Sequence, residues 1–139
     1  MARYWTGEHT KHRLQYHLVW IPKYRKRVLR GKIAIRLKGL LYEGCRMNGW
    51  WIHRIGIEHD HVHVLIQAKP RESIAELINI LKGGSSRALR KEFPELKEFL
   101  WGDSFWSDGY FAETVGKVDE AVIRRYIEAQ QNSQIMPED

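Results

Sequence analysis

The 139-residue chain is predicted to adopt an α+β fold, in which helices pack on a mainly antiparallel sheet. Three observations lead to this prediction. Several short runs alternate apolar and polar residues, which indicates strands, and two of these runs are close enough in sequence to form a hairpin. Longer segments repeat apolar residues at helical spacing. The predicted order is strand, helix, hairpin, helix, strand and helix, in one domain spanning residues 1–139.

The first half of the chain is predicted to hold a strand, a helix and the hairpin. Apolar and polar residues alternate over residues 14–21 and stop before a proline, which is a strand pattern. Over residues 32–48, apolar residues recur at helical spacing, and an Asn-Gly pair follows as a typical helix end. The β-branched runs 51–58 and 61–67 are separated by only two residues, so we expect them to pair as an antiparallel hairpin.

A second helix is predicted to begin after Ser73, because Ser73 and Glu76 form a capping box ahead of an apolar stripe. The adjacent Gly83 and Gly84 should loosen the far end of this helix. The donor-rich side chains around the two glycines are expected at the surface, where they would suit phosphate oxygens or equally plain solvent. They are Lys82, Ser85, Ser86 and Arg87.

The last third of the chain is predicted to form a strand and a helix. Aromatic and β-branched residues over 105–115 indicate a strand that is bulged at Gly109. Gly116 breaks the chain, and an apolar stripe over 117–131 then predicts the final helix. Because glycine is conformationally permissive, Gly116 is a candidate hinge for that helix. The polar tail, 132–139, is expected to be frayed.

Two histidines stand out in the second strand of the hairpin. His61 and His63 are two residues apart, so their side chains project from the same face about 6.6 Å from one another. The apolar residues Val62, Val64 and Ile66 face the other way. Histidine is the commonest metal ligand in proteins, and this spacing allows two imidazoles to bind one ion. The alternative is that both rings only decorate a polar sheet face.

The composition favours a polyanionic partner. The formal net charge is +6 and the pI is about 9.5, with a basic run over residues 23–27 that contains Tyr24 and follows Trp20. Basic groups attract phosphates, and aromatic rings offer surfaces on which unpaired bases stack. Cys45 is the only cysteine, which excludes an internal disulfide and cysteine-based zinc motifs. With no membrane-spanning run and no leader apparent, we expect a cytoplasmic protein with no membrane partner.

On the predicted last helix, Tyr126 and Gln130 are four residues apart and share nearly one face. By itself, such a tyrosine is usually a partly buried packing residue, and such a glutamine is usually solvated. Their significance depends on what the rest of the chain contains.

Five segments together resemble the HUH transposases with a single catalytic tyrosine, of the insertion sequence 200/605 type. The resemblance spans nearly the whole chain, and the segments occur in the family's order and spacing. They are Tyr16-His17-Leu18-Val19-Trp20-Ile21-Pro22-Lys23-Tyr24-Arg25, Asp60-His61-Val62-His63-Val64-Leu65-Ile66, Leu81-Lys82-Gly83-Gly84-Ser85-Ser86-Arg87, Trp106-Ser107-Asp108-Gly109-Tyr110-Phe111 and Tyr126-Ile127-Glu128-Ala129-Gln130.

The resemblance implies a ferredoxin- or RRM-like HUH nuclease fold and a strand-transfer activity on DNA. It implies that His61, His63 and Gln130 hold a divalent metal, Mg²⁺ or Mn²⁺, and that Tyr126 attacks a DNA phosphodiester to give a 5′-phosphotyrosine. It further implies single-stranded DNA with hairpins near the element ends as substrate. The implied assembly is a homodimer in which Tyr126 of one subunit completes the histidine site of the other.

Six residues are candidate DNA contacts because of their charge and their place in the matching segments. One departure from the family pattern is His59, which stands where the family often has proline, so its role in the site or in the turn is open. The roles of His17 and of each candidate contact are likewise open. The candidates are Lys23, Tyr24, Arg25, Arg27, Lys82 and Arg87.

Three alternatives remain at the level of sequence. A relaxase or rolling-circle nickase shares the paired histidines and a tyrosine, but relaxases usually take their third ligand from another histidine, and Gln130 speaks against that class. A non-catalytic single-strand or hairpin DNA-binding protein would keep the basic surface without needing Tyr126. A metal-dependent hydrolase would use water as nucleophile and form no protein-DNA adduct.

Overall fold

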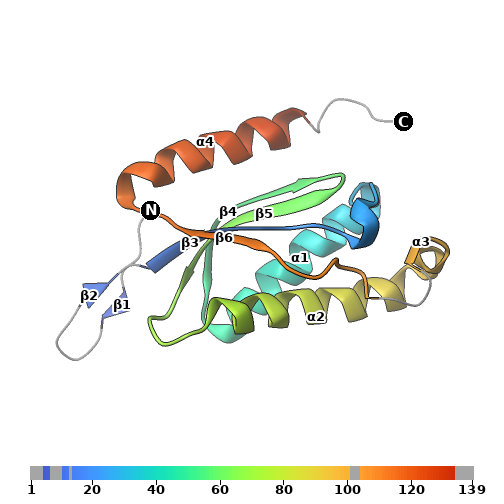
Figure 1. Cartoon of the computed structure of the whole chain (residues 1–139), viewed down its shortest axis with the longest axis horizontal. Coiled ribbons are helices and arrows are strands. Elements are labelled where there is room, and N and C mark those ends of the chain that lie inside the picture. Colours follow the sequence, from blue (N-terminus) through green and yellow to red (C-terminus); the bar gives the residue numbers. More distant parts are fainter. Residues whose placement is uncertain (1–4, 7–10, 13, 101–103, 134–139) are drawn as a thin grey trace.

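A four-stranded antiparallel sheet forms the centre of the computed structural model, which describes residues 5–6, 11–12, 14–100 and 104–133. The strands lie in the order β4-β5-β3-β6, so β4 and β6 are the edges (Figure 1). Their bounds are β3 Leu14–Trp20, β4 Trp51–Glu58, β5 His61–Ala68 and β6 Phe111–Thr114. A separate short pair is formed by β1 Trp5–Thr6 and β2 Lys11–His12.

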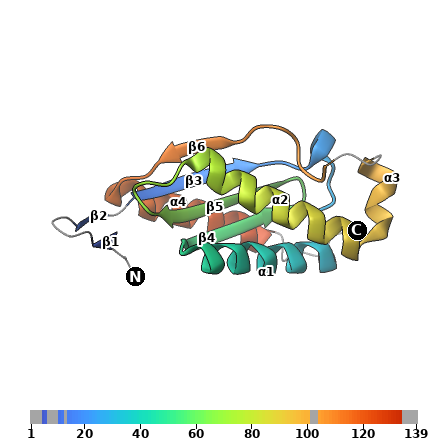
Figure 2. The same cartoon turned by 90° about the horizontal axis from the view of Figure 1, so that it is seen from below.

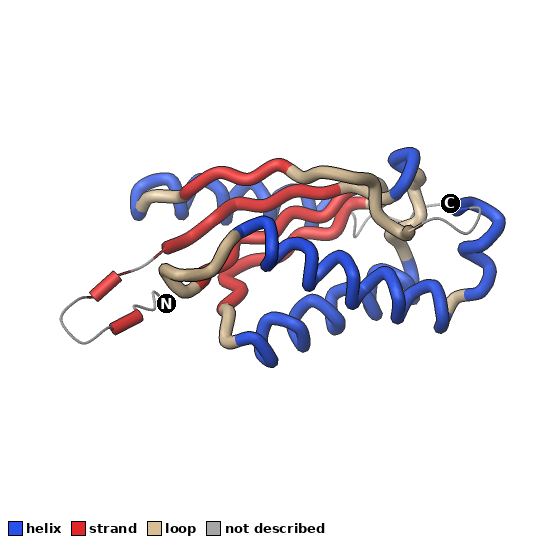
Figure 3. The backbone as a smooth tube through the Cα atoms, turned by 60° about the horizontal axis from the view of Figure 1, so that its bottom comes forward, coloured by secondary structure: helices blue, strands red, loops and turns tan. Residues whose placement is uncertain are grey.

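Helices cover both faces of the sheet. The helices α1, Gly31–Asn48, and α2, Ile74–Glu92, lie side by side on one face, and α4, Lys117–Ser133, lies across the other (Figures 2 and 3). Short turns of helix complete the fold: η1 Lys23–Arg25, η2 Pro94–Leu96 and α3 Lys97–Leu100. The predicted α+β fold is confirmed, with the predicted strands and helices in the predicted order.

The main core lies between the sheet and the α1–α2 pair. Val62, Val64 and Ile66 point into it from β5, as their alternation predicts, and Leu37 and Leu77 meet them from the two helices. Helix α1 ends where predicted, because Gly49 adopts the left-handed conformation (φ 76°) that caps a helix and that a side chain would disfavour. Ser73 caps α2 as predicted, with its hydroxyl accepting a hydrogen bond from the backbone N–H of Glu76 at 3.3 Å.

Two local predictions were wrong. Helix α2 continues without interruption through Gly83 and Gly84, because its buried face packs against α1 and the sheet and outweighs the modest helix cost of glycine. The predicted strand over 105–115 is regular only in β6. Its first part, ahead of Gly109, is held by an isolated bridge between Pro22 and Trp106 instead.

The C-terminal helix runs to Ser133, two residues beyond its predicted end. The remainder of the expected frayed tail, residues 134–139, lies outside the described residues. Within the described ranges, no helix is both long enough and apolar enough to cross a bilayer.

Candidate active site

The two histidines of β5 lie on the sheet face that α4 covers. His63 pairs with Val19 of β3 and with Gly56 of β4, and His61 pairs with Glu58 near the hairpin turn. The ring centroids of His61 and His63 are 5.0 Å apart. His63 is only 2% exposed, whereas His61 is partly open to solvent. The sequence-predicted pairing of the two rings on one face is thus present.

A glycine lets α4 approach the histidines. A Cβ atom at Gly56 would lie 2.7 Å from a methyl carbon of Ile127 and 3.0 Å from Cδ2 of His63. The first distance is shorter than real Cβ atoms show and the second is unusually tight, and Ile127 is itself buried. Gly56 therefore makes the close packing of helix, strand and imidazole possible.

A carboxylate orients His61. The Nδ1–H of His61 donates to Oδ1 of Asp60 at 2.8 Å, and Nε of Arg25 donates to Oδ2 of the same carboxylate at 3.0 Å. Burial alone would raise the pKa of Asp60, but the bonds and charges of His61 and Arg25 together lower it, so the carboxylate stays ionised. With its Nδ1 proton held, His61 has its Nε2 lone pair available for a ligand.

His63 is kept neutral by its surroundings. Burial, together with the charges that His61 and His17 carry when protonated, lowers the pKa of His63 to about 4. Gln130 lies close enough to oppose this lowering, although no hydrogen bond of good geometry joins the two side chains. A neutral imidazole has a lone pair, so His63 can bind a cation at neutral pH.

Helix α4 places Tyr126 beside this pair within the same chain. The rings of Tyr126 and His63 meet edge to face with centroids 5.6 Å apart, and Tyr126 remains 52% exposed. Nε2 of Gln130, one turn further on, donates to the phenol oxygen of Tyr126 at 2.7 Å. The structure therefore brings together all four residues to which the sequence analysis assigned catalysis and metal binding. Their roles stay predictions.

Polar contacts dock α4 on the sheet. Nε of Arg54 donates to Glu128 at 2.6 Å, and Nη2 of Arg124 donates to Nδ1 of His53 at 3.3 Å. His53 in turn donates through Nε2 to Oε1 of Gln67 at 2.9 Å. Ile127 is buried and Ile123, one turn earlier, is partly buried, so α4 is held by these apolar residues together with polar groups. The polar groups bond water equally well when the helix moves away.

Four buried acceptors near the histidines have no donor among the described residues. They come from four different elements: Nε2 of His17 in β3, Oε2 of Glu58 in β4, Nε2 of His63 in β5 and Oε1 of Gln130 in α4. Each can present a lone pair, His63 in the neutral form that carries its proton on Nδ1. Unmatched buried acceptors are costly, and a cation with its bound water supplies what they lack. Nitrogen and oxygen donors of this kind suit Mg²⁺ or Mn²⁺, so the residues fit the metal that the family resemblance implies.

The two histidines do not form a complete set of metal ligands. Across the part of the chain that the structure describes, no three His, Cys, Asp or Glu side chains lie close enough together to hold an ion by themselves. The two histidines therefore need the Gln130 amide, water or a substrate oxygen to complete a coordination shell.

Sequence reasoning left the role of His17 open and missed Glu58 and Glu113 as neighbours of the site. The alternation over residues 14–20 places His17 on the same face as Gln15 and Val19, but only the strand order brings that face beside His63. His59, whose role was open, lies at the hairpin turn. Its Nδ1 accepts from Arg27 at 3.0 Å and its carbonyl accepts from the backbone of Leu29 at 3.0 Å, so it ties the basic segment to the turn.

The basic segment runs directly past the histidines. Arg25 and Arg27 contact Asp60 and His59, and Tyr24 between them is 61% exposed. Tyr24 and Arg25 have φ angles of 59° and 52°, a left-handed conformation that costs energy for residues with side chains. This strained turn presents an aromatic ring and several cations beside the site.

The donor-rich end predicted around Gly83 and Gly84 is engaged inside the protein. Nζ of Lys82 donates to the carbonyls of Ser107 and Gly109 at 2.7 and 2.9 Å, and burial lowers the pKa of Lys82. Ser85 and Ser86 are buried and bond the indole of Trp106 and the backbone of Phe105. The expectation of surface donors is wrong for both serines, because residues 105–109 cover them.

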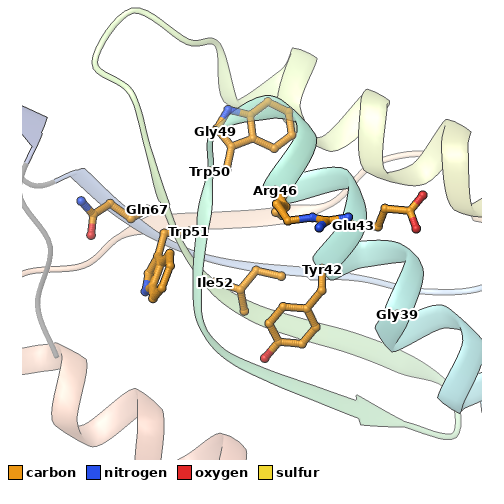
Figure 4. A pocket seen from close by; sticks show the side chains of 10 residues that line it. Gly39, Tyr42, Glu43, Arg46, Gly49, Trp50, Trp51, Ile52 and Gln67 are labelled. Atoms are coloured by element: carbon orange, nitrogen blue, oxygen red, sulfur yellow. The ribbon is translucent and has the colours of Figure 1, made fainter.

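Arg87 borders a different surface. It lines a hollow of about 430 Å³ whose walls are mostly basic: Arg87, Arg90, Lys91, Pro94 and Lys97. A larger hollow of about 680 Å³ lies between α1 and β4, with Tyr42, Trp50, Trp51 and Arg46 in its wall (Figure 4). It reaches Gln67, about 20 Å along β5 from His61, so it is not part of the histidine site.

Comparisons with known proteins agree on one family. Residues 10–130 match the family described as "Transposase IS200 like". A relative named "ISDra2 transposase TnpA", from Deinococcus radiodurans, is 38% identical over 123 residues, which is 88% of either chain. A Salmonella typhimurium protein named "Transposase for insertion sequence element IS200" is 34% identical over 122 residues, covering 88% of this chain and 80% of that one.

Solved structures give the same result for the fold. A putative transposase from Deinococcus radiodurans superposes with a TM-score of 0.75 at 35% identity, covering 91% of this chain and 98% of the other. A REP-associated tyrosine transposase bound to a REP hairpin gives a TM-score of 0.66 at 12% identity, covering 93% and 74%, and shows a shared fold only. The chain therefore belongs to the IS200-like transposases, a family of DNA-processing enzymes.

Proposed function

We propose that this protein cleaves and rejoins single-stranded DNA at insertion-sequence ends through a covalent bond to Tyr126. The single observation that carries the proposal is the juxtaposition on one sheet face of Tyr126, Gln130 and the His61–His63 pair. A phenol that is half exposed and next to a cation-binding pair is accessible to a large substrate. A packing tyrosine has no need of these neighbours.

The proposed reaction is a transesterification. The phenol oxygen of Tyr126 attacks the phosphorus of a phosphodiester and loses its proton, the bond from phosphorus to the 3′ oxygen breaks, and that oxygen takes up a proton. The 5′ phosphate is left esterified to the tyrosine. A later attack by a 3′-hydroxyl releases the phenol and restores a phosphodiester, so rejoining needs no ATP. The Gln130 amide N–H, 2.7 Å from the phenol oxygen, stabilises negative charge developing there.

His61, His63 and Gln130 would hold a divalent metal, Mg²⁺ or Mn²⁺. When bound, the metal polarises the phosphate and offsets charge in the transition state. The protein's own contribution is positional: Asp60 fixes the His61 ring, burial keeps His63 neutral, and α4 presents the Gln130 amide from the opposite side.

The substrate we propose is single-stranded DNA with hairpins near its ends. The basic segment beside the site carries Lys23, Arg25 and Arg27 around the exposed Tyr24, which suits a backbone with unpaired bases. A transposase of the same fold is described as bound to a REP hairpin, which supports hairpin recognition here. Arg87 and the basic hollow beside it offer a second place for phosphates.

The proposal includes a homodimer that shares its active sites. Helix α4 is docked in part by polar contacts and follows Gly116, so we expect that it can leave its own sheet for that of a partner. Mixing His61→Ala with Tyr126→Phe subunits should restore one complete site in exchanged heterodimers. Cleavage that stays absent in verified heterodimers would confine each site to one chain.

Adduct formation tests the chemistry. A labelled single-stranded oligonucleotide carrying the element end, with Mg²⁺ or Mn²⁺, should give a protein-DNA species that survives denaturing electrophoresis. Tyr126→Phe should abolish it, while Tyr42→Phe, which changes another exposed tyrosine, on α1, should not. An adduct that persists in Tyr126→Phe would move the nucleophile elsewhere. Cleavage without any adduct would favour a hydrolase that uses water.

A further inference from the structure

His17 is a buried histidine to which the proposed reaction assigns no role. It lies on β3, paired across the strands with Leu65 of β5 and Glu113 of β6. Its Nδ1 is 3.1 Å from Oε1 of Glu113, and because a carboxylate only accepts, Nδ1 carries the proton. In the neutral ring Nε2 is then a lone-pair acceptor, and it is fully buried with no donor in the described part of the protein.

This arrangement repeats the one at His61. Asp60 holds Nδ1 of His61 at 2.8 Å, and Glu113 holds Nδ1 of His17 at 3.1 Å, so both rings have Nε2 free to bind. The ring of His63 lies between them, 5.0 Å from His61 and 5.9 Å from His17 between centroids. Histidines that serve metal sites are commonly fixed in this way by a carboxylate on the other nitrogen.

His17 is nevertheless not placed to be a direct ligand beside the other two. No three His, Cys, Asp or Glu side chains of the described residues converge on one point, and this includes the three histidines. The Nε2 lone pair of His17 therefore needs a donor that lies between it and the ion. A water bound to a divalent cation supplies such a donor, and the cation's charge makes its O–H a stronger one.

We propose that His17, oriented by Glu113, is a positioning residue of the metal centre whose Nε2 accepts a hydrogen bond from a water on the divalent ion. The inference rests on the proposed function, because it requires an ion at His61, His63 and Gln130. It goes beyond that function by assigning His17 and Glu113, which belong to neither the ligand set nor the nucleophile.

Binding of Mn²⁺ to the full chain, without DNA, tests the inference. Titration calorimetry should show about tenfold weaker Mn²⁺ binding for His17→Phe, the range typical of lost outer-sphere contacts. His17→Gln should recover most of the affinity, since its amide oxygen is also an acceptor of similar reach. Glu113→Gln should weaken binding in the same direction but less. Ser86→Ala, which changes a buried polar residue of α2 on the opposite side of the sheet, should leave the affinity unchanged.

Spin-echo modulation of bound Mn²⁺ separates a water-mediated role from direct ligation. The imidazole nitrogens coupled to the ion should be the same in number in the wild type and His17→Phe, and fewer in His61→Ala. Loss of a coupled nitrogen in His17→Phe would overturn the proposal by making His17 a ligand, and unchanged affinity in that variant would overturn it too. Melting curves in EDTA confirm that each variant is folded.

The same titration distinguishes failure of the inference from failure of the proposed function. If the wild type binds Mn²⁺ in a manner that depends on His61 but not on His17, only the role of His17 is refuted. If the wild type binds no Mn²⁺, or binds it equally well as His61→Ala, the metal site of the proposed function is itself wrong.

Discussion

The two faces of the central sheet bury different kinds of side chain. Toward α1 and α2, β5 presents Val62, Val64 and Ile66, and the surrounding core is apolar. Toward α4, the same strands bury polar groups: Gln15, His17, His53, His63 and Gln67. One sheet thus separates a face that stabilises the fold from a face that carries the proposed chemistry.

The difference has an energetic consequence. Apolar burial contributes about 25 cal/mol for each square ångström removed from water, whereas a buried polar group contributes little even when it is bonded. Helix α4 should therefore be held more weakly than α1 or α2. A weakly held helix that carries the proposed nucleophile would suit the proposed sharing of active sites between two subunits.

The largest expected effect is on stability, and it comes from comparing one buried apolar residue on each side of the sheet. Leu77→Ala, in the α1–α2 core, should lower the free energy of unfolding by about 2 to 5 kcal/mol, since it leaves a cavity in a rigid region. Ile127→Ala should lower it by less than half as much, because α4 can shift to fill the space. Urea denaturation measures both. Equal losses would show that α4 is as firmly integrated as α2.

Acidic pH should lower the stability of the fold through a buried histidine on the polar face of the sheet. In the unfolded chain histidine has a pKa of about 6.5, and in the folded protein the pKa of His63 is lowered to about 4. Between these values the unfolded state binds more protons, so stability falls as pH drops through that window, by no more than about 3 kcal/mol. Denaturation in EDTA at pH 7, 5.5 and 4.5 should show this slope, and His63→Phe should reduce it. An unaltered slope would assign the acid sensitivity to other groups.

A methyl group added at Gly56 should disturb the docking of α4 more than it disturbs the folding of the chain. Gly56→Ala places a carbon against Ile127 and His63, so α4 should shift, with a stability loss of about 1 to 3 kcal/mol. Adduct formation should fall about a hundredfold, because a misplacement of about 1 Å has that effect on a reacting group. Gly84→Ala, in open space within α2, should stabilise the fold by up to about 1 kcal/mol. Normal activity in Gly56→Ala would mean that α4 does not act from this position.

The smallest effect concerns exposed ion pairs. Arg54→Ala removes the bond to Glu128 that ties α4 to β4, and should change stability by only about 0.2 to 1 kcal/mol. Its signature should be faster hydrogen exchange in α4 at low salt, with the difference shrinking in 1 M salt. Arg36→Ala, which breaks the pair with Glu92 between α1 and α2, should leave exchange in α4 unchanged.

Much of the site could be anticipated from residue order. The alternation over 61–67 correctly placed both histidines on one face, and the spacing of Tyr126 and Gln130 correctly placed them one helical turn apart. The roles attached to them came from the family resemblance. The surface expectation is wrong for Ser85 and Ser86 because their partners, Trp106 and Phe105, are 21 and 19 positions away and no local pattern reveals that contact.

The sequence by itself determined the strands, the helices, the histidine face and the family, because these depend on periodicity and on short motifs that are local along the chain. Only the tertiary structure decided that β3 lies beside β5, which brings His17 and Glu113 to the site, and that Gly56 admits α4 over His63. The physical reason is that strand order and helix docking follow from burying surface between distant segments. The energy of that burial depends on the complete packed structure and cannot be assigned to any one segment of the sequence.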